Sequence, residues 1–147
     1  MIILNKEVQQ MNNRYIFRGK RKDNGEWIDG YLYITHNGEY EISRYDNVLG
    51  VERLTRIVIP ETIGQCTGLR DKNGNLIFED DFLRFTNYDG KQSTYKVFYD
   101  DICAGWRVGE VSCGCIEEMS DWESYRKYFE VLSNIHDNPE LLLEVER

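Results

Sequence analysis

A chain of 147 residues can form one domain or two small ones, and its 41% hydrophobic content is enough to build a core, which excludes an intrinsically disordered protein. No apolar run approaches the roughly 20 residues that cross a bilayer, and residues 1–4 are too short for a signal peptide, so we expect a cytoplasmic protein. The net charge of −8 argues against a cationic nucleic-acid-binding protein.

Charge is distributed unevenly along the chain. Residues 1–60 contain nine Lys or Arg and eight Asp or Glu, whereas residues 61–147 contain nine and eighteen. The charge therefore changes after Pro60, although no flexible linker composition surrounds this residue. We expect two packed lobes: a small N-terminal antiparallel sheet lobe over residues 1–60 and a C-terminal lobe over residues 61–147.

The N-terminal lobe is predicted to be a small antiparallel sheet. Short β-branched and aromatic segments alternate with Gly-containing turn signals at residues 23–25 and 36–38. Tyr31 and Tyr33 alternate with aliphatic residues, which predicts a strand with tyrosines on one face and aliphatic side chains on the other. The expected strands cover residues 14–18, 27–35, 39–43 and 56–59.

The central stretch is predicted to be a hairpin followed by a charged elbow. Asn73-Gly74 is a dipeptide that a two-residue type I′ turn prefers, and apolar residues lie on both sides of it. The elbow is Glu79-Asp80-Asp81, and the next strand is expected over residues 82–85.

The C-terminal lobe is predicted to be a small β-barrel with short helices. Strands are expected over residues 93–99, 105–109 and 129–135, at the close spacing typical of small barrels. Ser120 and Glu123 have the spacing of a capping box, which predicts a helix that begins at Ser120. The lobe is thus expected to be mainly β with minor α.

Three blocks of sequence carry a resemblance to a known family. They are Tyr15-Ile16-Phe17-Arg18-Gly19-Lys20, then Ile63-Gly64-Gln65-Cys66-Thr67-Gly68-Leu69-Arg70-Asp71-Lys72-Asn73-Gly74, and then Ser133-Asn134-Ile135-His136-Asp137-Asn138-Pro139-Glu140-Leu141-Leu142. In this order they resemble the YopX family of phage and prophage proteins, which has no established biochemical activity. The resemblance implies an SH3-like barrel in residues 61–147.

The chain departs from the family pattern at a few positions. Cys66 replaces an aromatic residue, Asp80 replaces a glycine, and Ser133 and His136 replace a glycine and a tyrosine. Asp is among the few residues that tolerate a left-handed backbone, so Asp80 leaves the expected fold intact if the elbow needs that conformation.

The start of the chain lies outside the resemblance. The family begins at the position of Met11, so we interpret Met11 as an alternative start and residues 1–10 as a possible appendage.

The cysteines suggest no disulfide framework. Cys66, Cys103, Cys113 and Cys115 are expected to be reduced thiols in a chain without a secretion signal. Cys113 and Cys115 could share a zinc ion with Cys103, Cys66 or His136, but zinc sites usually have Cys-x₂₋₄-Cys spacing. We therefore favour two half-buried thiols on one strand face, and we expect no metal and no cofactor.

Catalytic patterns are weak. Cys113 could pair with His36 or His136 as nucleophile and base, but the local signatures of cysteine enzymes are missing. The elbow at residues 79–81 could hold a cation or an acid/base pair, yet such residues more often form a solvated elbow or cap a backbone N–H. We therefore expect no enzymatic activity.

One basic concentration lies near the start of the chain, interleaved with Tyr15 and Phe17. Its cations could hold a nucleic-acid backbone while the aromatic rings stack on bases. This gives an alternative function, nucleic-acid binding, with the candidate residues Arg14, Arg18, Lys20, Arg21 and Lys22.

The favoured interpretation is a phage or prophage accessory protein that binds an unknown protein partner or forms a homo-oligomer. Its tyrosines and tryptophans suit interfaces. The acidic C-terminal lobe leaves a further alternative open, in which its carboxylates are presented to a basic groove of a host protein.

Overall fold

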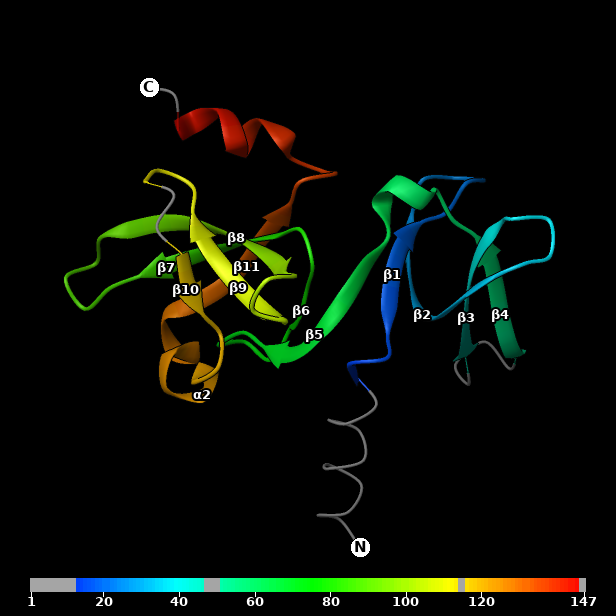
Figure 1. Cartoon of the computed structure of the whole chain (residues 1–147), viewed down its shortest axis with the longest axis horizontal. Coiled ribbons are helices and arrows are strands. Elements are labelled where there is room, and N and C mark those ends of the chain that lie inside the picture. Colours follow the sequence, from blue (N-terminus) through cyan, green and yellow to red (C-terminus); the bar gives the residue numbers. More distant parts are fainter. Residues whose placement is uncertain (1–12, 47–50, 114–115, 146–147) are drawn as a thin grey trace, which may run out of the picture. The chain divides into compact units, whose positions relative to one another are not determined.

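A computed structural model describes residues 13–46, 51–113 and 116–145, which form a mainly β protein with two antiparallel sheets (Figure 1). The strand order is β4-β3-β2-β1-β5-β6 in one sheet and β10-β9-β8-β7-β11 in the other. The chain divides into two compact units, Met1–Gly68 and Leu69–Arg147. The proposed start at Met11 and the appendage before it lie outside the described residues.

The first unit is an antiparallel sheet, as predicted. Ile28 and Leu32 point from β2 into a core that also contains Ile42 and Val58. The intervening residues of β2 point to the opposite face, because side chains alternate along a strand. The elements are β1 (Phe17–Lys20), β2 (Trp27–Ile34), β3 (Tyr40–Asp46), β4 (Val51–Ile57), η1 (Pro60–Thr62) and β5 (Gly64–Arg70).

The segment after Pro60 is tied to β1. The Lys20 N–H donates to Thr62 Oγ1 at 2.8 Å, and Phe17 pairs with Gln65 across the β1–β5 ladder. Gly19 allows β1 to pass close to Val58, since a Cβ at this glycine would lie 3.0 Å from Val58 Cβ. The charge change after Pro60 therefore falls inside the first unit.

The second unit packs its core on one face of the five-stranded sheet. Phe129 lies at the centre of this core, with ring centroids 4.9 Å from Trp122, 5.1 Å from Phe85 and 5.5 Å from Tyr95. The elements are β6 (Leu76–Phe78), β7 (Asp81–Thr86), β8 (Gln92–Asp100), β9 (Gly105–Glu110), β10 (Ile116–Glu118), α2 (Trp122–Tyr125), η2 (Arg126–Tyr128), β11 (Phe129–Asn134) and η3 (Pro139–Val145).

The predicted capping box is wrong. Asp121, not Ser120, occupies the N-cap of α2, and its side chain accepts the Ser124 hydroxyl at 3.0 Å but makes no capping hydrogen bond to a backbone N–H. The Ser120 hydroxyl donates to Glu118 instead, and the burial of Trp122 decides where this short helix lies. Within the described residues, no helix has the length and apolar character needed to cross a membrane.

The predicted type I′ turn is also wrong. Gly74 has a φ of +84°, but Asn73 is not among the residues with positive φ. The loop instead has three residues, since the Asp71 N–H donates to Asn75 O and the Gly74 N–H donates to Asp71 O. The Asp71 carboxylate selects this loop by accepting the N–H groups of Asn73 and Asn75, both at 2.9 Å.

The expected tolerance of a left-handed backbone at Asp80 is confirmed. Asp80 has a φ of +67°, and its side chain pairs with Lys96 at 3.0 Å and with His136 at 3.5 Å. Asp80 and His136, which both depart from the family pattern, thus contact each other.

Asp71 is a fully buried carboxylate that joins the central turn to β11. In addition to the two turn N–H groups, it accepts the Val131 N–H at 2.9 Å and the Asn75 side-chain amide at 3.3 Å. Burial alone would raise the pKa of Asp71, but the hydrogen bonds from Val131, Asn75 and Asn73 outweigh it and hold the pKa below its usual value.

We predict that Asp71→Asn destabilises the protein by about 2 kcal/mol, because the new amide N–H₂ faces the Val131 N–H and leaves it without an acceptor. The pKa of Asp71 is lower in the folded protein than in the unfolded chain. Its stabilisation is therefore present above the unfolded pKa and is lost as the pH falls through the folded pKa. Urea unfolding at a series of pH values measures both effects.

Asp89→Asn is the matched control, since it removes the same charge from an exposed turn. Equal loss of stability in the two variants at neutral pH would contradict the role given to Asp71.

Candidate functional site

One face of the first unit's sheet carries exposed aromatic and cationic side chains. Directly opposite residues in an antiparallel ladder share a face. Lys20 lies opposite Trp27 and Arg18 opposite Asp29, while Tyr31 and Tyr33 continue the same face along β2. We call the set of Arg18, Lys20, Trp27, Tyr31, Tyr33 and Arg53 the aromatic face.

Cations hold two of these rings. The Arg18 guanidinium carbon lies 4.8 Å from the centre of the Trp27 ring, and Lys20 Nζ lies 5.4 Å from it. Arg53 lies 6.0 Å from the Tyr33 ring, and the Tyr33 hydroxyl donates to Glu41, which raises the pKa of Tyr33. Tyr31 remains 50% exposed and Tyr33 38% exposed. These contacts support the positions of the Trp27 and Tyr33 rings on the face.

The five basic residues predicted from sequence do not form one cluster. Only Arg18 and Lys20 share the aromatic face, through Trp27. Arg21 is occupied, since its Nη2 lies 2.7 Å from Asp23 Oδ2, which raises the pKa of Arg21 and lowers that of Asp23. Arg14 precedes β1 with its side chain against Gly68, and Lys22 lies in the turn after β1.

Phe17 does not lie beside these cations. It packs against the core of the first unit, on the face opposite Arg18 and Lys20, so the predicted stacking role of Phe17 is wrong. Trp27, which lies next to the two cations in space but not in sequence, is the ring that they contact.

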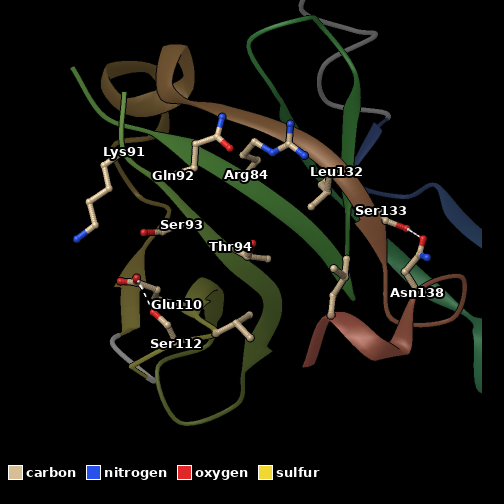
Figure 2. A pocket seen from close by; sticks show the side chains of 12 residues that line it. Arg84, Lys91, Gln92, Ser93, Thr94, Glu110, Ser112, Leu132, Ser133 and Asn138 are labelled. Carbon is tan, nitrogen blue, oxygen red and sulfur yellow. Dashed lines mark hydrogen bonds between the residues drawn. The ribbon is translucent and has the colours of Figure 1, made fainter. Parts of the chain in front are cut away.

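The second unit contains a polar groove of about 650 Å³ (Figure 2). We define the groove by its lining residues from β7, β8, the end of β9, β11 and η3. Glu110 and Ser112 line one end, and Ser133 and Asn138 line the other. The lining consists of Arg84, Lys91, Gln92, Ser93, Thr94, Glu110, Val111, Ser112, Leu132, Ser133, Asn138 and Leu141.

A bulge in β11 shapes the groove. The β7–β11 ladder changes register between Val131 and Ser133, which leaves Leu132 as the extra residue. Val131 packs against the core, whereas Leu132 lines the groove. The bulge thus lets two consecutive residues, Leu132 and Ser133, line the same groove.

Two charged groups of the groove, Arg84 and Glu110, interact with neighbouring side chains. Arg84 Nη1 lies 3.4 Å from Glu130 Oε1. Glu110 accepts the Ser112 hydroxyl at 2.8 Å and the Tyr95 hydroxyl at 3.3 Å. Burial, together with the neighbouring Glu110 carboxylate, raises the pKa of Tyr95 to about 12.

The cysteines and histidines are not assembled into a catalytic or metal site in the part of the chain that the structure describes. Cys66 and Cys103 form no disulfide, but Cys113 is disulfide-bonded and exposed in a turn, so the expectation of a reduced, half-buried Cys113 is wrong. Cys115 lies outside the described residues. His136 contacts Asp80, and no group of three or more metal-ligating side chains occurs among the described residues.

The charged elbow has a structural role. Asp81 is buried and accepts the Phe78 N–H at 2.8 Å, as expected for an Asp that caps a backbone N–H. Asp80 pairs with Lys96 and His136, so two of the three elbow carboxylates hold the fold together.

The chain was compared with known proteins. A family model described as YopX protein matches residues 4–143. Among solved structures, the crystal structure of protein EF1440 from Enterococcus faecalis is similar, with 24% identity and a TM-score of 0.49, over 86% of this chain and 96% of that chain. A search of curated proteins found no match.

The Tyr95 pKa gives a prediction for alkaline pH. Because the folded pKa of about 12 lies above the usual value of 10.0, Tyr95 stabilises the fold below pH 10, and this stabilisation is lost as the pH rises towards 12. We expect Tyr95→Phe to flatten the alkaline decline in unfolding free energy. Tyr88→Phe, at a tyrosine that is 89% exposed, is the control and should leave the decline unchanged.

Proposed function

Because the chain belongs to the YopX family, we propose that it is a non-enzymatic phage or prophage accessory protein that binds a protein partner, or a second copy of itself, through the aromatic face. The observation that carries this proposal is the exposure of Tyr31 and Tyr33 on a sheet face where cations already hold Trp27 and Tyr33. The phage origin and the action inside a bacterial host rest on the family resemblance alone.

The chemistry of the aromatic face supports protein binding. Trp, Tyr and Arg are the residues that most often dominate the binding energy of protein interfaces. Tyrosine and tryptophan rings lose little conformational entropy on binding, and the strands of a sheet hold them in fixed positions. The acidic side chains Asp29 and Glu41 lie on the same face and would favour a partner with both polar and apolar character.

The fold proposal for residues 61–147 is an SH3-like barrel. The order β10-β9-β8-β7-β11 describes a four-strand meander followed by a strand that returns beside the first. The 3₁₀ turn η2 directly precedes that last strand. Both features support the SH3-like proposal, which the family resemblance first suggested.

The non-enzymatic part of the proposal is supported by the roles of the polar side chains. Asp71 and Asp81 bind backbone N–H groups, and His136 pairs with Asp80. These residues are therefore occupied in holding turns and strands in place.

We predict that Tyr31→Ala weakens partner binding or self-association by at least about tenfold, because it removes an exposed ring from the centre of the aromatic face. A pull-down from host lysate with nuclease present, followed by mass spectrometry, measures partner capture. Light scattering after size-exclusion chromatography measures self-association.

Tyr88→Ala is the matched control, because Tyr88 is an exposed tyrosine in a turn of the other unit. The proposal would be contradicted if the protein is strictly monomeric and captures no partner. It would also be contradicted if Tyr31→Ala and Tyr88→Ala change partner capture equally.

Nucleic-acid binding is the second candidate, favoured by the contacts of Arg18 and Lys20 with the partly buried Trp27 ring. Cations beside an aromatic ring suit a single strand, whose phosphates and bases they can contact together. The sequence pI of about 4.8 opposes this candidate, since the field of the whole protein repels phosphates.

If this second candidate holds, Arg18→Ala combined with Lys20→Ala should abolish salt-dependent binding of a fluorescent single-stranded oligonucleotide, followed by anisotropy. Arg126→Ala with Lys127→Ala removes equal charge from the other unit as a control. If the oligonucleotide binds equally well to both double variants and to the unchanged protein, nucleic-acid binding through Arg18 and Lys20 is excluded.

A further inference from the structure

We propose that the groove of the second unit binds a small organic oxyanion, a compound that carries a carboxylate or a phosphate on a short aliphatic body. This inference is independent of the aromatic face and of the function proposed for it. It rests on which polar groups of the groove are occupied and which are available.

The available groups of the groove include one obligatory donor, the Lys91 ammonium, and three side chains that can both donate and accept. The side chains of Lys91, Gln92, Ser93 and Thr94 make no hydrogen bond or ion pair within the described residues, although each can donate one. These four consecutive residues line the groove together with Arg84, whose one ion pair, with Glu130, is long at 3.4 Å. An acceptor-rich ligand is therefore the natural complement of this wall.

The one carboxylate of the groove and the amide oxygen of Asn138 already accept hydrogen bonds. The Glu110 carboxylate accepts the hydroxyls of Ser112 and Tyr95. At the other end, Asn138 Oδ1 accepts the Ser133 hydroxyl at 2.5 Å, and the Asn138 amide donates to Glu140 at 2.6 Å. A cationic ligand would compete with these hydroxyls for the Glu110 carboxylate, whereas an oxyanion would not.

The charge of the groove differs from that of its unit. Residues 69–147 carry nine Lys or Arg and seventeen Asp or Glu, a net charge of −8, whereas the groove lining has two cations and one carboxylate. Arg84 has the Glu130 carboxylate 3.4 Å away, whereas the Lys91 ammonium has no carboxylate partner among the described residues. Lys91 is therefore the cation of the groove that we propose an anion would contact.

The remaining lining residues determine which kind of ligand body fits the groove. Val111, Leu132 and Leu141 supply apolar surface, and no aromatic side chain lines the groove to stack on a base. Its volume of about 650 Å³ lies within the range of about 300–1,000 Å³ of small-molecule sites. A short aliphatic chain with a terminal oxyanion matches both the apolar and the cationic parts.

The proposal is tested by titrating the full-length protein with hexyl phosphate, hexanoate, hexanol and inorganic phosphate while recording amide chemical shifts. We expect saturable shifts at residues 91–94 and 110–112 for hexyl phosphate or hexanoate, with Kd near the millimolar range, about −4 kcal/mol. The tighter of these two probes identifies the oxyanion class. Equal binding of inorganic phosphate would show an adventitious ion only, and equal binding of hexanol would show a purely apolar patch; either result overturns the proposal.

Lys91→Gln should weaken the tighter probe by about fivefold to tenfold, because it removes the unpaired cation of the groove. Thr94→Val removes an uncharged donor and should weaken binding of the same probe less than Lys91→Gln does. Lys127→Gln removes the same charge outside the groove and should leave the affinity unchanged. Both lysines are exposed, so folding should be retained. Equal effects of the two lysine variants, or no saturable binding of any probe, would overturn the proposal.

Discussion

The buried carboxylate of Asp71 is the interaction on which the second unit most depends. It accepts N–H groups from its own turn and from Val131, which is far away in the sequence, and so fixes where β11 lies relative to the central turn. A buried charge is tolerated only when several hydrogen bonds replace its hydration. The position of β11 then places Phe129 in the core and Leu132 in the groove. One side chain thus links the local loop, the core and the groove.

The parts of the fold that follow from short-range patterns were predictable. Alternation and Gly-containing turns predicted the mainly β fold, the positions of β2 and β3, and the final strand at Phe129. The strands expected over residues 14–18 and 56–59 overlap only in part with β1 (Phe17–Lys20) and β4 (Val51–Ile57). The type I′ turn and the capping box failed because side chains compete for the same backbone groups. The Asp71 carboxylate selects a three-residue loop around Asn73-Gly74, and burial of Trp122 shifts the short helix past Ser120. Dipeptide and capping preferences do not take into account this competition between side chains for backbone groups.

The candidate sites were less predictable, because both depend on register. Arg18 and Lys20 were recognised as candidates, but the ring that they contact, Trp27, lies on the neighbouring strand and is identified only by the β1–β2 pairing. The groove needs segments from five elements and a bulge at Leu132 that no sequence pattern marks. Its one local signal is the polar run of Gln92, Ser93 and Thr94 at the start of β8.

Asp80 and His136 show how a sequence can depart from its family pattern without losing the fold. A left-handed residue at the elbow favours glycine, and Asp tolerates it at a modest cost. The Asp80 side chain then gains contacts that glycine cannot make, with Lys96 and with His136. Because His136 belongs to the turn after β11, this contact ties the elbow to the same strand that Asp71 positions. The contact between Asp80 and His136 therefore helps to hold the elbow against the end of β11.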